Sequence, residues 1–484
     1  MTTILDELKE SGKTGPYIGG SWSHGASELA VVDPATEDVL VDIGLAEASD
    51  ADDAVAAAYE ALTPWGDTPP RERGEILRRT FEAMRAREED LAELIVLENG
   101  KAFPDALGEV RYAAEFFRWF SEEASRIGGE VRLAPGGDKR IITVRQPVGV
   151  SVMITPWNFP AAMATRKIGP ALAAGCTAIV KPASDTPLTT LAVVHLMEEA
   201  GLPAGVVNVV VAKGSSGVVE RMLHDPRVRK LSFTGSTEVG QTLLKVAADQ
   251  VLNVSMELGG NAPFIVFEDA NLDAALEGAM VAKMRNAGEA CTAANRFLVH
   301  ASVVEEFTSM LAGAMGAMKV GPGIDRTTQV GPMINEKSRD DIAQLVQAAV
   351  DSGAGVAIGA SVPDRRGFFY EPTVLSGVSP DSTILDKEIF GPVAPVVSFD
   401  SDDEAIAMAN DTVHGLISYV YTDDLARGLR TAEAIESGMV GLNRGLVSDP
   451  AAPFGGVKQS GIGREGSHEG IEEFLELKYI ATSW

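Results

Sequence analysis

The sequence predicts an α/β protein with parallel sheets, and two observations carry this prediction. From residue 148 to about 260, short apolar runs alternate with alanine-rich helical stretches. A second alternating region extends from 262 to about 440. Apolar strands between helices are typical of a parallel sheet that helices cover on both faces.

The segment ahead of these regions is predicted to be helical and then extended. Residues 50–125 are mostly helical in pattern, because 54–61 are rich in alanine and 70–97 carry apolar positions at helical spacing. Residues 131–148 have a strand pattern that Pro147 closes.

One predicted strand of the first alternating region ends at Lys181, a candidate ligand-binding residue. Parallel sheets bind ligands at the carboxyl ends of their strands, and Lys181 stands at such an end. The predicted strands are 148–154, 177–181 and 205–212, and the predicted helices between them are 167–174 and 189–200.

The second region and the tail complete the expected elements. Residues 262–267 and 296–300 are predicted strands, and 303–318 form a predicted helix. The tail, 473–480, alternates and is expected to be an edge strand. The sequence has no internal repeat, low-complexity linker or long charge block, so we expect its domains to pack together.

Length, charge and cysteine content narrow the class of protein. At 484 residues the length favours about three domains. The excess of 69 acidic over 41 basic residues argues against nucleic acid or an anionic membrane as a partner. Two cysteines, a polar acidic N-terminus and the absence of any run of about 18 apolar residues indicate a cytoplasmic protein without a membrane span.

Three residues form a candidate catalytic set. Cys291 lies in a polar, glycine-containing run, Glu257 precedes two glycines, and Asn158 lies in a turn-rich segment. A thiol, a carboxylate and an amide are the nucleophile, base and oxyanion donor that attack on a carbonyl needs. Each alone has an ordinary structural interpretation, as a buried thiol, a solvated strand end or a turn residue. For the other cysteine, Cys176, we accept the structural one.

Two further segments suit a phosphate or ribose. The run 233–240 follows a predicted strand and is expected to open a helix at Gln241, with Gly235 and Gly240 spaced for a turn beside a phosphate. It lacks the G-x-G-x-x-G fingerprint and is only suggestive. Lys181 and Ser184 offer a cation and a hydroxyl at a strand end.

Two arginines, Arg166 and Arg285, flank these motifs in the sequence. Guanidinium groups near a nucleophile suit a substrate carboxylate, whereas ordinary arginines make surface or structural salt bridges. We assign no metal ligand.

The ordered set of motifs resembles the aldehyde dehydrogenase family over nearly the whole chain. Within that family it is most similar to the succinate-semialdehyde dehydrogenases, through 165–167, 284–286 and 461–467. The family motifs are Pro156-Trp-Asn-Phe-Pro160, Lys181-Pro-Ala-Ser184, Phe233-Thr-Gly-Ser236, Glu257-Leu-Gly-Gly260, the Cys291 segment, Glu388-Ile-Phe-Gly-Pro392 and Pro453-Phe-Gly-Gly-Val-Lys458.

The resemblance implies a covalent mechanism. The Cys291 thiolate would attack the aldehyde, with the oxyanion held by the Asn158 amide and the Cys291 backbone N–H. Hydride transfer to NADP or NAD would leave a thioester, and Glu257 would activate the water that hydrolyses it.

The resemblance also implies binding residues. Serine at position 184, where NAD-preferring members often have glutamate, leads us to expect that NADP is accepted and favoured. The implied cofactor-binding residues are Trp157, Lys181, Pro182, Ala183, Ser184, Gly235, Ser236, Leu258, Glu388 and Phe390. Arg166, Arg285 and Ser448 would hold the distal carboxylate of a small aldehyde substrate, most simply succinate semialdehyde.

Two departures from the family pattern bear on the site. Ala293 stands where a second cysteine is frequent, which excludes a local disulfide switch. Asp449 would oppose a bound carboxylate if it faced one.

The fold implied by the resemblance has three parts and assembles into a homodimer or homotetramer. These parts are a Rossmann-like cofactor domain (1–127 and 149–256), a catalytic α/β domain (257–459) and a small oligomerisation sheet (128–148 and 460–484).

Three other functions remain open on the sequence alone. One is a broader aliphatic or aromatic aldehyde dehydrogenase, in which the two arginines make structural pairs. Another is a cysteine esterase or hydrolase without redox chemistry, whose usual histidine base has no motif beside Cys291. The last is an idle scaffold, against which the intact set of Cys291, Glu257 and Asn158 argues.

Overall fold

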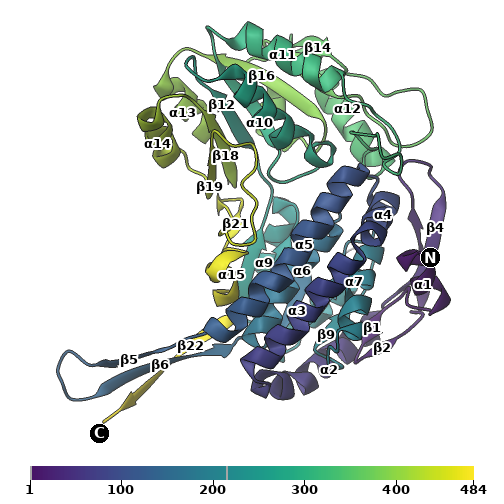
Figure 1. Ribbon diagram of the computed structural model, residues 1–484, viewed down its shortest axis with the longest axis vertical. Helices are drawn as coiled ribbons and strands as arrows, with labels where there is room; N and C mark the ends of the chain where they lie inside the picture. Colours follow the sequence, from purple (N-terminus) through teal and green to yellow (C-terminus); the bar gives the residue numbers. More distant parts are fainter. Residues whose placement is uncertain (1–2, 214–215, 484) are drawn as a thin grey trace.

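The computed structural model describes residues 3–213 and 216–483. Figure 1 shows two α/β lobes, with a thin three-stranded arm extending from one of them. Both parallel sheets that the sequence predicts are present, one in each lobe.

The first sheet has eight strands in the order β2-β1-β9-β8-β7-β10-β11-β21. Its central five strands, β9 to β11, run parallel, and β1 and β21 pair antiparallel with its flanks. The strands are β1 (Tyr17–Ile18), β2 (Ser21–Trp22), β7 (Val150–Ile154), β8 (Thr177–Lys181), β9 (Val207–Val209), β10 (Val228–Thr234), β11 (Asn253–Glu257) and β21 (Gly461–Ile462).

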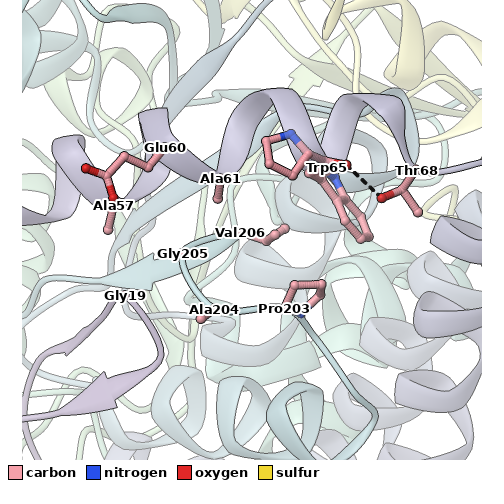
Figure 2. Close-up of a pocket in the computed structure, with 11 residues that line it drawn as sticks. Gly19, Ala57, Glu60, Ala61, Trp65, Thr68, Pro203, Ala204, Gly205 and Val206 are labelled. Atoms are coloured by element: carbon pink, nitrogen blue, oxygen red, sulfur yellow. Dashed lines mark hydrogen bonds between the residues drawn. The ribbon is translucent and has the colours of Figure 1, made fainter.

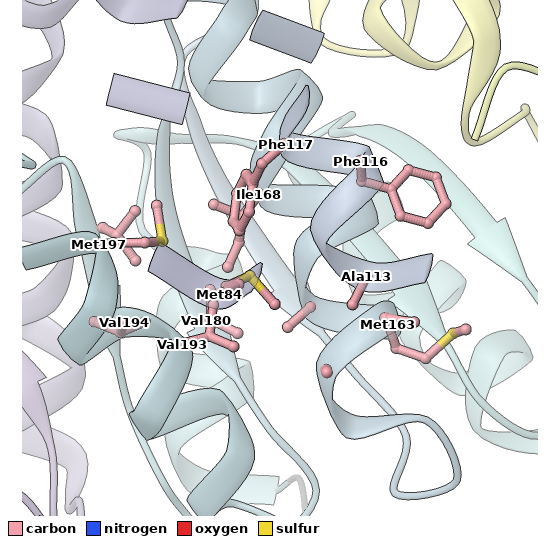
Figure 3. Packing of buried hydrophobic residues seen from close by; sticks show 14 of the residues in the cluster. Met84, Ala113, Phe116, Phe117, Met163, Ile168, Val180, Val193, Val194 and Met197 are labelled. Atoms are coloured by element: carbon pink, nitrogen blue, oxygen red, sulfur yellow. The ribbon is translucent and has the colours of Figure 1, made fainter. Parts of the chain in front are cut away.

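Helices pack around this sheet and build much of the apolar core. Met84, Phe117, Ile168 and Met197 come from four different helices and meet above Val180 of β8 (Figure 3). The helices are α1 (Ile4–Glu10), α2 (Ala48–Asp67), α3 (Pro70–Ala86), α4 (Glu88–Asn99), α5 (Phe103–Glu123), η1 (Ala124–Arg126), α6 (Pro160–Ala174), α7 (Leu188–Glu199), α8 (Ser216–His224) and α9 (Thr237–Asp249).

The second sheet has seven strands in the order β14-β15-β16-β13-β12-β18-β19, all parallel to their neighbours except β14. The strands are β12 (Ala262–Val266), β13 (Ala294–His300), β14 (Gly355–Ile358), β15 (Thr373–Ser376), β16 (Val393–Phe399), β18 (Ile417–Tyr421) and β19 (Met439–Leu442). The helices of this lobe are α10 (Leu272–Met284), η2 (Arg285–Gly288), α11 (Val304–Gly316), α12 (Glu336–Asp351), η3 (Thr383–Asp386), α13 (Asp402–Asn410) and α14 (Leu425–Ala434).

The arm consists of β5 (Glu130–Leu133), β6 (Arg140–Pro147) and β22 (Leu475–Thr482). The tail is an edge strand, as predicted, and pairs with β6 along its whole length (Figure 1). The remaining elements are α15 (Ser467–Glu472) and the short pairs β3 (Ser27–Val32) with β4 (Val39–Leu45) and β17 (His414–Gly415) with β20 (Val457–Lys458).

Three sequence predictions of element bounds were wrong. Helix α6 begins at Pro160 rather than 167, because proline suits the first helical position. Strand β9 is shorter than predicted. Helix α9 begins at Thr237 rather than Gln241, because the Ser236 hydroxyl accepts the N–H of Val239 at 3.4 Å and caps it.

The early start of α9 changes the interpretation of Gly240. This glycine lies inside the helix, not in a turn beside a phosphate. A Cβ built there would lie 2.4 Å from the Leu258 side chain, so glycine allows the helix to approach the strand end closely.

Within the described residues, no helix combines the length and the apolar character that crossing a bilayer requires.

Candidate functional site

The candidate residues of the first lobe lie at one edge of the first sheet. Strands β7, β8, β10 and β11 are parallel neighbours, so their carboxyl ends meet there. Ile154 of β7 pairs with both Lys181 and Phe233, and Thr234 pairs with Glu257. The sheet register therefore brings together motifs that are far apart in the sequence.

A cavity of about 200 Å³ opens at this edge, and we call it the Glu257 cavity. Its lining combines the candidate catalytic residues with most of the candidate cofactor residues. The lining residues are Pro156, Trp157, Asn158, Met163, Arg166, Thr234, Gly235, Ser236, Glu257, Leu258, Gly259, Cys291, Glu388, Phe390 and Phe454.

A neighbouring cavity of about 210 Å³, the Arg285 cavity, contains the candidate carboxylate-binding residues. It is lined by Pro104, Asp105, Gly108, Glu109, Tyr112, Phe159, Met163, Arg166, Arg285, Ala290, Cys291, Thr292, Leu446, Ser448 and Phe454. Met163, Arg166, Cys291 and Phe454 line both cavities, so the thiol lies where they meet.

A tight turn presents Cys291. Helix α10 ends at Met284, and Asn286 and Ala287 follow with φ of 54° and 52°, in the left-handed region that non-glycine residues rarely adopt. Burial raises the pKa of the Cys291 thiol to about 12; Arg166 and Arg285 oppose this rise, and Glu388 and Glu257 add to it. This environment favours the protonated thiol, so attack on an aldehyde must be accompanied by loss of that proton.

Asn158 is hydrogen-bonded to the turn that carries the Cys291 thiol. Its side-chain Nδ2 donates to the main-chain oxygen of Glu289 at 3.0 Å. Its own main-chain oxygen accepts from Lys101 Nζ at 2.7 Å and from Asn286 Nδ2 at 3.0 Å. The amide donor and the nucleophile are thus positioned by one hydrogen-bond network.

Lys101 belongs to a buried ion pair that the sequence analysis missed. Its ammonium lies 2.6 Å from Glu109 Oε2, and both side chains are fully buried. The other oxygen of Glu109 accepts the N–H groups of Ala161 and Ala162 at the start of α6. A lysine just beyond a helix end carries no sequence signal for such a role.

Glu257 is buried, and neither of its carboxylate oxygens has a hydrogen-bond partner among the described residues. Burial, reinforced by the nearby Glu465 carboxylate, raises its pKa well above the usual value, while Arg166 and Lys167 act in the opposite direction. A carboxylate with a raised pKa and free oxygens has the properties of a general base.

Arg166 makes a structural pair and also keeps a free donor. It forms a buried ion pair with Glu465, which also binds Lys167 at 2.5 Å, and its guanidinium lies 4.1 Å from the Phe454 ring centre. Its Nη2 has no hydrogen-bond partner within the described part of the chain. Glu465 lies in the motif 461–467, and no sequence pattern predicts its role in this pair.

The other candidate carboxylate-binding residues, Arg285 and Ser448, both line the Arg285 cavity. The Arg285 guanidinium lies 5.2 Å from the Phe159 ring centre, and Ser448 lines the same cavity. Asp449 is exposed and accepts the N–H of Ala451 at 2.8 Å, so its carboxylate is engaged in a turn. The opposing charge considered from the sequence is therefore not part of the lining.

The residues at the Glu257 cavity fit a nicotinamide cofactor. Trp157 and Phe390 meet edge to face at 5.4 Å, and Glu388 accepts the N–H of Gly260 at 3.0 Å. A Cβ on Gly259 would lie 2.8 Å from the Glu388 carboxylate, so a larger residue there would push this carboxylate from its position. Burial raises the pKa of Glu388 to about 7.

Lys181, Pro182, Ala183 and Ser184 lie along the sheet edge, beyond the lining of the two cavities. The Lys181 main-chain oxygen accepts the N–H of Thr155, which places this segment beside the Asn158 turn. The Lys181 ammonium is buried and contacts the oxygen of Pro182 at 3.3 Å. These residues are therefore arranged for the part of a cofactor distant from Cys291.

A larger hollow of about 390 Å³ lies elsewhere, between α2 and residues 203–206, beside Trp65 (Figure 2). It shares no lining residue with the cavities at Cys291, and it holds none of the candidate residues. The second cysteine, Cys176, is buried and its Sγ donates to the main-chain oxygen of Phe474, as its structural interpretation predicts.

The fold and this arrangement of thiol, carboxylate and amide define an aldehyde-oxidising enzyme of the Rossmann-like class. The model of the aldehyde dehydrogenase family matches residues 22–480, and the chain belongs to that family.

Individual relatives are similar over nearly their full length. A succinate-semialdehyde dehydrogenase of Paenarthrobacter nicotinovorans is 56% identical over 92% of this chain and 99% of that protein. The NADP(+) succinate-semialdehyde dehydrogenase GabD of Escherichia coli is 46% identical over 96% of each chain. The solved structure of the succinate-semialdehyde dehydrogenase of Burkholderia pseudomallei matches with a TM-score of 0.95, at 46% identity over 97% of each chain.

Proposed function

We propose that this chain oxidises succinate semialdehyde to succinate with NADP or NAD, through a covalent intermediate on Cys291. The observation that carries the proposal is the position of Cys291 between two cavities. One cavity holds the candidate base and cofactor residues, and the other holds two arginines and a serine suited to a distal carboxylate.

The residues of the chain supply three parts of the reaction, and the cofactor would supply a fourth. The Cys291 thiol gives up its proton to solvent water, and the thiolate attacks the aldehyde carbon; the Asn158 amide with the Cys291 backbone N–H stabilises the oxyanion that forms. A nicotinamide held beside Trp157, Glu388 and Phe390 would supply the hydride acceptor, which would leave a thioester on Cys291. Glu257, with two free oxygens, takes a proton from the water that hydrolyses the thioester, and succinate leaves.

Substrate selection rests on the Arg285 cavity. Arg166 Nη2, Arg285 and Ser448 offer donors to a carboxylate at the end of a short carbon chain. The rival function, a broader aldehyde dehydrogenase, draws support from the buried pair of Arg166 with Glu465, which satisfies part of that guanidinium within the protein.

The cofactor is proposed to bind with its nicotinamide ribose at Glu388, beside Phe390. The rest of the cofactor cleft is proposed to be lined by Trp157, Gly235, Ser236 and Leu258. The adenosine ribose of the cofactor is proposed to lie at Lys181, Pro182, Ala183 and Ser184. Serine at 184 places no carboxylate against a 2′-phosphate, and this favours NADP.

Assembly and compartment are part of the proposal. The arm presents an apolar row of Val131, Ile142 and Ile480, which are directly paired across its three strands. Val131 and Ile480 are 66% and 43% exposed in the single chain, which suits a homodimer or homotetramer interface. Both cysteines are free thiols, which suits the reducing cytoplasm.

The test is the initial rate of NADPH and NADH formation with succinate semialdehyde, glutarate semialdehyde and butanal, with Cys291→Ala as the blank. The proposal expects fast turnover of the carboxylated substrates, faster with NADP than with NAD, and none in the variant. Equal rates with butanal would favour the broader enzyme, and activity that persists in Cys291→Ala would remove the covalent mechanism.

A further inference from the structure

Tyr112 lines the Arg285 cavity, and its buried hydroxyl is unpaired among the described residues. The residue lies on α5, and its ring meets that of Phe116 at 4.9 Å and 70°. The hydroxyl oxygen is buried and has no hydrogen-bond partner among the described residues. Buried tyrosine hydroxyls usually find a partner, so this group marks a position where a ligand could complete the site.

The surroundings of Tyr112 favour an anionic ligand at the two guanidinium groups, although the acids Asp105 and Glu109 line the same cavity, Glu109 being paired with Lys101. The residue lines the same cavity as Arg166, Arg285, Ser448 and Cys291. Burial raises the pKa of the phenol, and the two guanidinium charges only partly oppose this. The hydroxyl therefore stays protonated and acts as a donor at neutral pH.

A second tyrosine near Cys291 provides an internal comparison. The hydroxyl of Tyr419 donates to the main-chain oxygen of Thr292 at 2.8 Å, and so it has a structural partner within the fold. Arg285 and Cys291 act electrostatically on both phenols. Of these two tyrosines, only Tyr112 has a donor left for a ligand.

We propose that the Tyr112 hydroxyl donates a hydrogen bond to the distal carboxylate of the substrate and is a specificity-determining residue of this enzyme. The inference rests on the proposed function, because it assumes that this carboxylate occupies the Arg285 cavity. A neutral donor in the same cavity as two guanidinium groups would add a directed hydrogen bond to their electrostatic attraction, and hydrogen bonds to charged groups are stronger than those between neutral groups.

The test compares the wild type with Tyr112→Phe, which keeps the ring packed on Phe116 and removes only the oxygen. Tyr419→Phe is the matched control, because it removes a buried hydroxyl with a structural partner. We would measure kcat/KM for succinate semialdehyde and for butanal, a four-carbon aldehyde without the carboxylate. Binding of succinate and of butyrate to the cofactor-free protein by calorimetry adds a readout that does not depend on turnover.

The proposal predicts that Tyr112→Phe lowers kcat/KM for succinate semialdehyde and weakens succinate binding by about 10- to 100-fold. The values for butanal and butyrate should stay within about twofold, and Tyr419→Phe should change both aldehydes alike. If the wild type prefers succinate semialdehyde over butanal and Tyr112→Phe keeps this preference, the role of Tyr112 is overturned and the proposed function is not. A wild type that does not prefer succinate semialdehyde over butanal would overturn this role together with the proposed function.

Discussion

The ammonium of Lys101 donates a hydrogen bond to the main-chain oxygen of Asn158 at 2.7 Å, deep inside the first lobe. Through Glu109, the same lysine is linked to the N-terminus of α6, which follows Asn158 in the chain. The candidate oxyanion donor is therefore oriented by a buried charge pair, because a turn alone would leave its peptide free to rotate.

This link predicts a catalytic defect in the double variant Lys101→Met/Glu109→Gln, which removes both charges and leaves neither unpaired. We expect kcat to fall about tenfold with KM little changed, since the oxyanion donor loses orientation. Steady-state kinetics, with p-nitrophenyl acetate as a cofactor-independent acyl donor, would measure it.

Glu98→Gln provides the control for the loss of a buried acid. Glu98 is fully buried and accepts the N–H groups of Leu188 and Thr189, at the start of α7. Both variants should lose stability, but only the double variant should lose kcat. If the two variants have equal kcat, Lys101 and Glu109 serve the fold alone.

The pair of Glu257 and Glu465 predicts a shift in the pH dependence of the reaction. Glu257 must be ionised to act as a base, so activity should rise with pH through its raised pKa. The Glu465 carboxylate raises that pKa, and Glu465→Gln removes the effect and frees Arg166 and Lys167 to lower it further.

The acid limb of the kcat profile should therefore move to lower pH in Glu465→Gln, even though the variant is less active and less stable. Breaking a buried pair costs about 3–5 kcal/mol, so profiles should be recorded below the melting range. An acid limb that stays in place or moves to higher pH would show that Glu257 does not set it.

Ser184→Glu should reverse the expected coenzyme preference. A carboxylate at the end of β8 would repel a 2′-phosphate and bind ribose hydroxyls, and like-charge contacts cost several kcal/mol. We expect KM for NADP to rise at least about tenfold, and KM for NAD to stay level or fall. Equal changes for the two coenzymes would place the 2′-phosphate away from Ser184.

The arm predicts that assembly depends on Ile480. Ile480→Asp puts a charge into the apolar row with Val131 and Ile142, so the variant should sediment as a smaller species than the wild type. Val251→Asp is the control, because Val251 is an apolar residue 88% exposed on the loop after α9. If Ile480→Asp has the same sedimentation coefficient as the wild type, the arm does not form the assembly interface.

The sequence predicted the α/β class, most elements and several of the residues that line the two cavities, because strand ends and motif residues carry local signals. The predicted start of α9 was too late in the chain. The glycine pattern suggested a turn up to Gln241, whereas the Ser236 cap begins the helix at Thr237. Sequence patterns missed Lys101, Glu109, Tyr112 and Glu465, whose roles depend on contacts between distant segments.

Periodicity on α5 identifies buried positions, and it cannot show which buried hydroxyl lacks a partner. Nor could spacing show that Asp449 turns to Ala451 and away from the cavity. These features arise from packing between segments, which a single sequence does not encode locally.

The central claim, a succinyl thioester on Cys291, can be tested most directly by trapping it in Glu257→Gln. Without the base, hydrolysis should be slow, while attack and hydride transfer continue. After incubation with succinate semialdehyde and NADP, mass spectrometry of the digested protein should find one succinyl group on Cys291 and none on Cys176. Unmodified Cys291 in a variant that has released one equivalent of NADPH would contradict the account.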